Sequence, residues 1–160
     1  MAIVRFEDIK AWQEARILTS QVHSMTASPR FKTSPELKKQ LERSTISAMA
    51  NIAEGFDCQN DREFVRFLFY ALRSASEVQS HLYVALDREL IEKRQFEELY
   101  GYCTSVKNLL LGFIRYLKTH RCEEGEDTSV GDRDGEIALA PDPALPTSGL
   151  GLRTSDSTDD

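Results

Sequence analysis

The sequence has few cysteines and no long apolar run, which argues against a disulfide-stabilised secreted domain and against a membrane-spanning protein. Its three cysteines, Cys58, Cys103 and Cys122, are odd in number and show no Cys-x-x-Cys spacing, so we interpret them as unpaired, non-catalytic thiols. No signal peptide is recognised at the N-terminus, which together with the thiols predicts a reduced, cytoplasmic compartment. No apolar run approaches the roughly 20 residues that a membrane-spanning helix needs.

The common catalytic and metal-binding motifs are also missing. The sequence contains no GxxxxGK(S/T) phosphate loop, no GxGxxG and no GxSxG elbow. Di-metal sites in helical bundles are built on Glu-x-x-His, and none of His23, His81 and His120 has a glutamate three positions before it. Glu77 and His81 are four residues apart, but without a second such pair we interpret them as a polar pair on one helical face. We therefore expect no metal, no cofactor and no enzymatic activity.

Charge is unevenly distributed along the chain. The net charge is −6, yet residues 1–122 hold 18 Lys and Arg against 15 Asp and Glu, a balance of +3. Residues 123–160 hold 2 basic and 11 acidic residues, a balance of −9, and have too little apolar content to offset the cost of ordering the chain. We predict one folded domain over residues 1–122 and a disordered acidic tail over residues 123–160.

The first 122 residues show the periodicity of amphipathic helices. Apolar residues recur in steps of three and four, which predicts four helices at about 7–25, 34–55, 60–85 and 93–120. Asn60 with Glu63 is typical of a capped helix start, and Gly55 stands where a left-handed residue would end the second helix. Short connections favour antiparallel neighbours. The predicted fold is all-α, an antiparallel up-down four-helix bundle.

The second predicted helix contains the most distinctive stretch, QLERSTISAMANIAEG at residues 40–55. Small residues line its apolar stripe, and beside that stripe a polar one follows helical spacing: Gln40, Arg43, Ser47, Asn51 and Glu54. Such a helix can be approached closely by another helix, another subunit or RNA. We favour a structural or subunit-contact role, with Ser47 and Asn51 bonded to the third helix through one of three partners: Arg73, Ser74 or Glu77.

Basic residues gather in three places on the predicted helices. The members of these groups are Lys38, Lys39 and Arg43; Arg62, Arg66 and Arg73; and Arg115, Lys118 and Arg121. If the faces adjoin, they would form a surface for phosphates of the kind that gives sequence-independent affinity. The alternative is a solvated charged face with weak ion pairs. A balance of +3 is a weak signal in a monomer, although a ring of copies would multiply it.

Three segments can be compared with known families. They read FEDIKAWQEAR near the start, QLERSTISAMANIAEG in the second helix and EFVRFLFYALRSASEVQSHLYVALD in the third. In this order they resemble the four-helix-bundle family of 23S rRNA intervening-sequence proteins. The most specific piece is NIAEG, from Asn51 to Gly55, with Gln40 and Arg43 upstream and the Ser-x-x-Glu that ends at Glu77 downstream.

The resemblance implies a small bacterial protein, of a kind often encoded inside insertions in large-subunit rRNA genes, that assembles as a barrel-shaped homopentamer. The family is similar to accessory proteins of diversity-generating retroelements, which bind nucleic acid and a reverse transcriptase. Two departures stand out. The segment SPRFKTSPELKKQ lacks an acidic-aromatic lead-in, and the acidic tail is an addition that would oppose nucleic-acid binding.

Two functions follow from these observations. The first is a non-catalytic oligomer that binds structured RNA or other nucleic acid, with phosphate contacts from Lys38, Lys39, Arg43, Arg62, Arg66 and Arg73. The second is a scaffold or accessory subunit that docks a protein partner such as a reverse transcriptase. Both assign packing or subunit contacts to one further set: Gln40, Ser47, Asn51, Glu54, Gly55 and Glu77.

Overall fold

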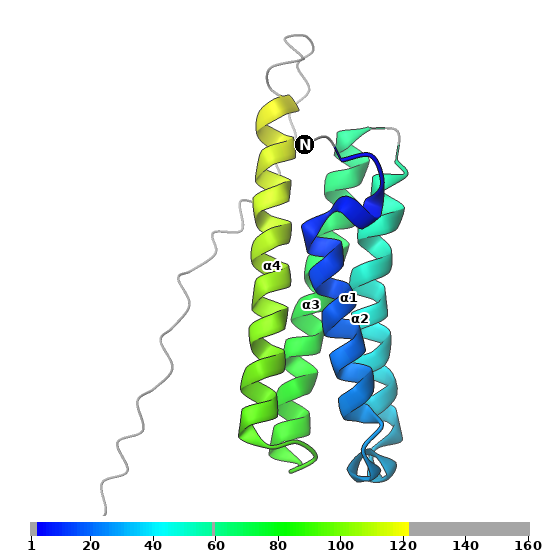
Figure 1. Cartoon of the computed structure of the whole chain (residues 1–160), viewed down its shortest axis with the longest axis vertical. Coiled ribbons are helices and arrows are strands. Elements are labelled where there is room, and N and C mark those ends of the chain that lie inside the picture. The colour runs from blue at the N-terminus through cyan, green and yellow to red at the C-terminus, as the bar shows by residue number, and fades with distance from the viewer. Residues whose placement is uncertain (1–2, 59, 122–160) are drawn as a thin grey trace, which may run out of the picture. The chain divides into compact units, whose positions relative to one another are not determined.

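The structure, a computed structural model, describes residues 3–58 and 60–121. It contains four α-helices and two short 3-10 turns, shown in Figure 1. The helices are α1 (Lys10–Thr26), α2 (Pro35–Phe56), α3 (Asp61–Asp87) and α4 (Lys93–Arg121). The turns are η1 (Phe6–Asp8) and η2 (Pro29–Thr33). The described ranges contain no strand, so the predicted all-α class is confirmed; the predicted tail over residues 123–160 lies outside them.

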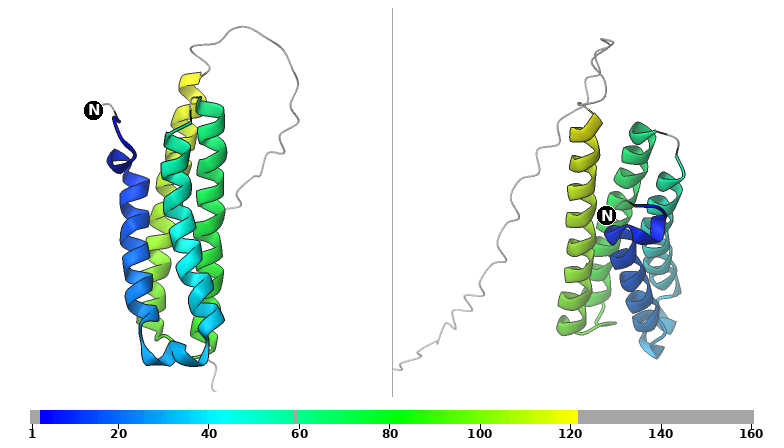
Figure 2. Two further views of the ribbon diagram at one scale, coloured as in Figure 1. Left: turned by 90° about the vertical axis from the view of Figure 1, so that its right-hand side faces the viewer. Right: turned by 45° about the horizontal axis from the view of Figure 1, so that its top comes forward.

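Successive helices run in opposite directions and close into a four-helix bundle (Figures 1 and 2). Around the bundle, α1 packs on α2, α2 on α3, α3 on α4, and α4 on α1. This is the predicted up-down arrangement. None of the helices in the described part of the chain combines the length and the apolar character needed to cross a membrane.

The core forms where the apolar stripes of the four helices meet. Side chains such as Leu18, Leu41 and Leu82 are fully buried there. The stripes predicted for the first three helices are buried throughout. On α4 the stripe from Leu99 to Leu117 is buried as well, whereas Phe96 and Phe113, which share its spacing of three and four residues, are only half-buried. Burial of these stripes, at about 25 cal/mol per Å² of apolar surface, is the main force that holds the bundle together.

Local signals position several helix ends. Asn60 caps α3, since its side-chain oxygen accepts a hydrogen bond from the Glu63 amide at 2.9 Å, as predicted. Pro35 begins α2 directly after Ser34, although the Ser34 side chain makes no capping bond. At the other end of α3, Glu89 takes a φ of 57°, and the Leu90 amide donates to the Ala85 carbonyl at 2.9 Å. This is a Schellman ending, which turns the chain sharply toward α4.

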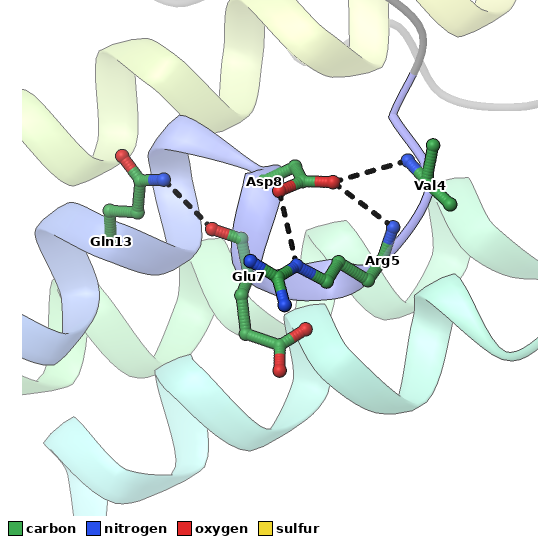
Figure 3. Close-up of polar contacts among 5 residues, drawn as sticks. All are labelled: Val4, Arg5, Glu7, Asp8 and Gln13. Carbon is green, nitrogen blue, oxygen red and sulfur yellow. Dashed lines mark hydrogen bonds and ion pairs between the residues drawn. The ribbon is translucent and has the colours of Figure 1, made fainter.

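The predicted start of the first helix at Glu7 is wrong, because the chain first makes the η1 turn and α1 begins at Lys10. Figure 3 shows the reason: the Asp8 carboxylate accepts hydrogen bonds from the backbone amides of Val4 and Arg5, both at 3.3 Å, and from Arg5 Nε at 3.4 Å. Gln13 Nε2 then donates to the Glu7 carbonyl at 2.8 Å. Desolvation acts to raise the pKa of Asp8, but the hydrogen bonds from Val4 and Arg5 and the charge of Arg5 outweigh it and hold that pKa below its usual value.

The predicted role of Gly55 as a left-handed helix end is also wrong. Gly55 lies inside α2, which continues to Phe56, and no glycine in the described ranges has a positive φ. What the position requires is space. A Cβ built on Gly55 would lie 2.7 Å from Phe64 Cδ2 and 2.7 Å from Phe67 Cβ, closer than real carbon atoms approach. Gly55 therefore allows α3 to pack directly against the α2 backbone.

Candidate interaction surface on α2 and α3

The centre of the polar stripe joins α2 to α3. Ser47 Oγ lies 3.0 Å from Ser74 Oγ, so the two hydroxyls form a hydrogen bond between the helices. Asn51 Nδ2 donates to the Ser47 carbonyl at 2.8 Å and to Ser47 Oγ at 3.2 Å. Of the partners expected on the third helix, Ser74 is the one observed. The half-buried Ser47 and the buried Ser74 thereby help to fix how α2 and α3 align. Asn51 was expected to bond to the third helix as well, but both of its hydrogen bonds stay within α2.

The ends of the stripe face solvent. Gln40, Arg43 and Glu54 are exposed, on the same side of α2 as the Ser47–Asn51 pair. On α3, Glu77 pairs with His81, with 3.4 Å between the Glu77 carboxylate and His81 Nε2. His81 Nε2 is buried and has no hydrogen-bond partner among the described residues, so this contact is a close approach of two polar groups one helical turn apart. Within the described residues no three His, Cys, Asp or Glu side chains gather as metal ligands would.

The predicted phosphate contacts fall on more than one side of the bundle. Lys38 turns toward α1 and lies 3.6 Å from the Glu42 carboxylate. Lys39, Arg43 and Arg62 are exposed. Arg66 pairs with Glu63 at 2.9 Å. These positions therefore do not form one continuous basic face.

Acidic side chains are interleaved with the arginines of α2 and α3. The Arg73 guanidinium lies 5.9 Å from the centre of the Tyr70 ring, which is 39% exposed. Arg66 and Arg73 are seven residues apart and so share one side of α3. Glu63 and Glu77 lie on that side as well, and Glu54 faces it from α2. The surface between α2 and α3 thus carries mixed charge with an exposed aromatic ring.

A polar cluster between α1 and α2 was not anticipated from the sequence. The Glu42 carboxylate accepts a hydrogen bond from Thr26 Oγ1 at 2.6 Å and lies 3.8 Å from His23 Nδ1. Thr26 is buried, and the Glu42 side chain is 22% exposed. Since Glu42 lies 16 residues from Thr26 along the chain, only the packing of α1 on α2 brings them together.

The two described cysteines are free, as predicted. Cys58 is half-buried and Cys103 is buried in the core. Burial raises the pKa of the Cys103 thiol to about 12, even though the charge of Lys107 acts to lower it. Cys103 is therefore an inert core side chain. Cys122 lies outside the described residues.

The fold and its α2 motif match a known family. The sequence profile of the family described as 23S rRNA-intervening sequence protein matches residues 7–112, a range that holds α1, α2, α3 and most of α4. The chain belongs to this family. The family resemblance expected from the α2 and α3 segments is thereby confirmed, and the match ends before the acidic residues that follow α4.

Among solved structures, the chain is similar to the crystal structure of a protein of unknown function from the S23 ribosomal protein family of Bacteroides thetaiotaomicron. The two share 23% identity over 65% of this chain and 97% of that chain, with a TM-score of 0.60. At this identity the likeness shows a shared fold. None of the curated proteins matches the chain.

Proposed function

We propose that this family member is a non-catalytic, homo-oligomeric protein that binds nucleic acid through exposed cations on its helices. The observation that carries the proposal is the alignment of α2 and α3 by the Ser47–Ser74 bond, which brings Arg43 and Arg73 onto adjoining outer faces. The family description refers to 23S rRNA, which makes structured RNA the first ligand to test. Following the resemblance, the expected assembly is a homopentamer, in which such faces would repeat around a ring.

One observation favours binding over catalysis. A surface hollow at one end of α1 and α4 is lined by side chains that include Ser24, Ser28 and Glu98. Within the described residues neither serine is hydrogen-bonded to Glu98 or to another base, so the hollow holds no paired nucleophile. The proposed role is therefore recognition, without chemistry on the bound partner.

The test uses the full chain and a structured RNA hairpin, with affinity measured by fluorescence anisotropy over a range of salt concentrations. A variant with Arg43, Arg66 and Arg73 all changed to glutamine is compared with one in which Lys10, Lys32 and Arg94, exposed elsewhere, are changed to glutamine. Both variants remove the same charge. We expect the first to bind more weakly and to lower the salt slope by about 0.9 for each phosphate that it no longer neutralises. Equal weakening in the two variants, or no binding by the wild type at low salt, would refute the proposal.

Net charge offers a second test of the same proposal. Ending the chain after Arg121 removes the acidic segment at residues 123–160 and changes the net charge from −6 to +3. Because a more positive protein attracts a polyanion more strongly, we expect tighter RNA binding at low salt and convergence with the full chain at high salt. Far-UV circular dichroism checks that the shortened chain keeps its helices. Unchanged affinity at low salt would count against an electrostatic binding mode.

A scaffold that docks a protein partner is the second candidate, and the mixed charge of the α2–α3 surface favours it. Alternating Arg and Glu around the exposed Tyr70 ring is closer to a protein interface, with an apolar centre and a polar rim, than to a phosphate surface. The resemblance implies a partner such as a reverse transcriptase. Co-purification of one specific protein that survives the Arg43, Arg66 and Arg73 changes, without RNA binding, would favour this candidate.

Self-assembly is common to both candidates and can be tested directly. Light scattering on the purified chain gives the mass of the assembly, with five copies expected. Changing the half-buried Asn51 to leucine should disturb the α2–α3 alignment or the subunit contact and so alter the mass or the melting temperature. A variant with both properties unchanged would remove Asn51 from the packing set.

A further inference from the structure

A second face of the bundle, between α3 and α4, carries aromatic rings that the core does not fully cover. Tyr83 on α3 is 45% exposed, and its ring centre lies 4.8 Å from that of Phe96 and 5.8 Å from that of Tyr100, both on α4. Phe96 and Tyr100 are half-buried and lie 5.4 Å apart. The three rings therefore pack against one another, and this packing holds the partly exposed Tyr83 ring at the surface.

A cation lies next along the same face. Lys107 Nζ donates a hydrogen bond to Gln79 Oε1 at 2.9 Å, and Gln79 Nε2 donates to Thr104 Oγ1 at 3.2 Å. Gln79 is buried, with 7% of its surface exposed. These bonds join α3 to α4 and hold the half-buried Lys107 ammonium in position. Among the described residues no carboxylate lies within ion-pair distance of that ammonium.

A second cation continues the line toward the end of α4. Lys118 Nζ lies 5.5 Å from the centre of the Phe69 ring on α3. Lys107 and Lys118 are 11 residues apart, which is about 16 Å along a helix, and Tyr100 is about 10 Å beyond Lys107 in the other direction. Rings and cations thus alternate along the α3–α4 face over about 27 Å.

This face differs in charge from the α2–α3 surface. From Leu99 to Arg121, α4 contains no acidic residue. On α3, Glu77 is two positions from Gln79 and so projects from the opposite side of the helix. The acidic residues near the face are Asp87 and Glu97 at the loop end, where Glu97 pairs with Lys93 at 3.8 Å, and Asp61 at the start of α3, which lies five helical turns from Gln79 and so on the same side. Beyond that end, α4 adds cations to the face and no carboxylate.

We infer that the α3–α4 face binds single-stranded nucleic acid, with unpaired bases stacking on the Tyr83 ring cluster and phosphates contacting Lys107 and Lys118. Aromatic platforms combined with a positively charged track are the general means by which proteins hold single strands without reading their sequence. The inference rests on the proposed nucleic-acid binding and goes beyond it, because it names a second surface, separate from the arginines of α2 and α3, and an unpaired ligand for that surface. Stacking and phosphate contacts do not require a 2′-hydroxyl, so single-stranded RNA and DNA should both bind.

The test measures the affinity of the full chain for a labelled oligouridine, an oligothymidine and an RNA duplex of equal length by fluorescence anisotropy. We expect the single strands to bind more tightly than the duplex. Tyr83→Ala should weaken single-strand binding about 5- to 150-fold, the range for removal of one stacked base, whereas Tyr83→Phe keeps the ring and should retain binding. Tyr116→Ala is the matched control, because Tyr116 is 54% exposed on α4 but lies two positions from Lys118 and so faces another side.

Changing Lys107 and Lys118 together to glutamine should lower the salt slope for single strands by about 0.7 for each phosphate that is no longer neutralised. Thermal melts and light scattering establish that each variant keeps its fold and mass. If Tyr83→Ala and Tyr116→Ala bind alike, or if the wild type prefers the duplex, the α3–α4 inference is overturned while nucleic-acid binding stands. If Tyr83→Ala changes only the mass of the assembly, the face is a subunit contact and the inference again fails. If the wild type binds no nucleic acid at low salt, the proposed function itself falls.

Discussion

Replacing Gly55 by alanine tests how closely α2 and α3 approach each other. The new methyl group would lie 2.7 Å from Phe67 Cβ and 2.7 Å from Phe64 Cδ2, whereas ordinary carbon contacts are 3.4–4 Å. The buried Phe64 ring is packed against the rings of Phe56 and Phe113, and Phe67 Cβ moves only with the α3 backbone. Overpacking of this kind costs about 1–3 kcal/mol. Against it stands the gain of up to about 1 kcal/mol when alanine replaces glycine inside a helix.

Gly112 provides the matched control for this experiment. It also lies inside a helix, α4, and a Cβ added there would meet nothing within 4 Å. Gly112→Ala should therefore stabilise the protein by up to about 1 kcal/mol. The difference between the two variants isolates the steric cost at Gly55, expected to be about 1–3 kcal/mol. Urea unfolding followed by far-UV circular dichroism measures both, at one fixed protein concentration because the proposed self-assembly would make stability depend on concentration. Equal stabilisation by the two alanines would refute the close approach of α3 to α2.

Three further predictions address other contacts. Ser47→Ala and Ser74→Ala should each cost about 1 kcal/mol, with a coupling of about 0.5–1.5 kcal/mol in a double-mutant cycle, because the two hydroxyls bond to each other at 3.0 Å; strictly additive effects would argue against that bond. Glu42→Ala should lower the free energy of unfolding by about 1 kcal/mol, because it removes the 2.6 Å acceptor of the Thr26 hydroxyl, which keeps a second acceptor in the His23 carbonyl at 3.2 Å; Glu42→Gln should cost less. In the native protein a thiol reagent should modify Cys58 much faster than Cys103, whose pKa is raised to about 12 by burial; equal rates in peptide mass spectra would contradict the packing around α4.

The periodicity of apolar residues predicts the four helices and their inner faces well, because burial repeats with the helical turn. Leu41, Ala48 and Ile52 are each spaced for the core and each is fully buried. The same reasoning places Ser47 and Asn51 together on the side of α2 that meets α3. Periodicity does not tell how closely two helices approach each other. Gly55 was therefore predicted to end the second helix, although a glycine is needed there because α3 approaches the α2 backbone closely.

Contacts that depend on how two helices are aligned are the ones that sequence reasoning missed. Nothing in the periodicity of α2 pairs Glu42 with Thr26, because their meeting depends on the length and course of the η2 turn between the helices. The Tyr83 ring cluster has the same origin: the Schellman ending at Glu89 sets where α4 begins beside α3. The predicted phosphate contacts on α2 and α3 likewise turned out to have glutamates among them once the two helices were placed together.

The up-down order of the helices also governs how the chain reaches its fold. Three of the four packed pairs join helices adjacent in sequence, and only α1 with α4 closes a long loop. Bundles with such local contacts fold in about microseconds to milliseconds, whereas synthesis adds roughly 5–20 residues each second. The α2–α3 hairpin, with Gly55 at its contact, should therefore form on the ribosome seconds before α4 has emerged. During that interval the apolar side of α3 that α4 later covers, which includes Leu72 and Tyr83, is exposed to solvent and can aggregate. Substitutions that slow the docking of α4 should therefore reduce the yield of folded protein before they reduce its equilibrium stability.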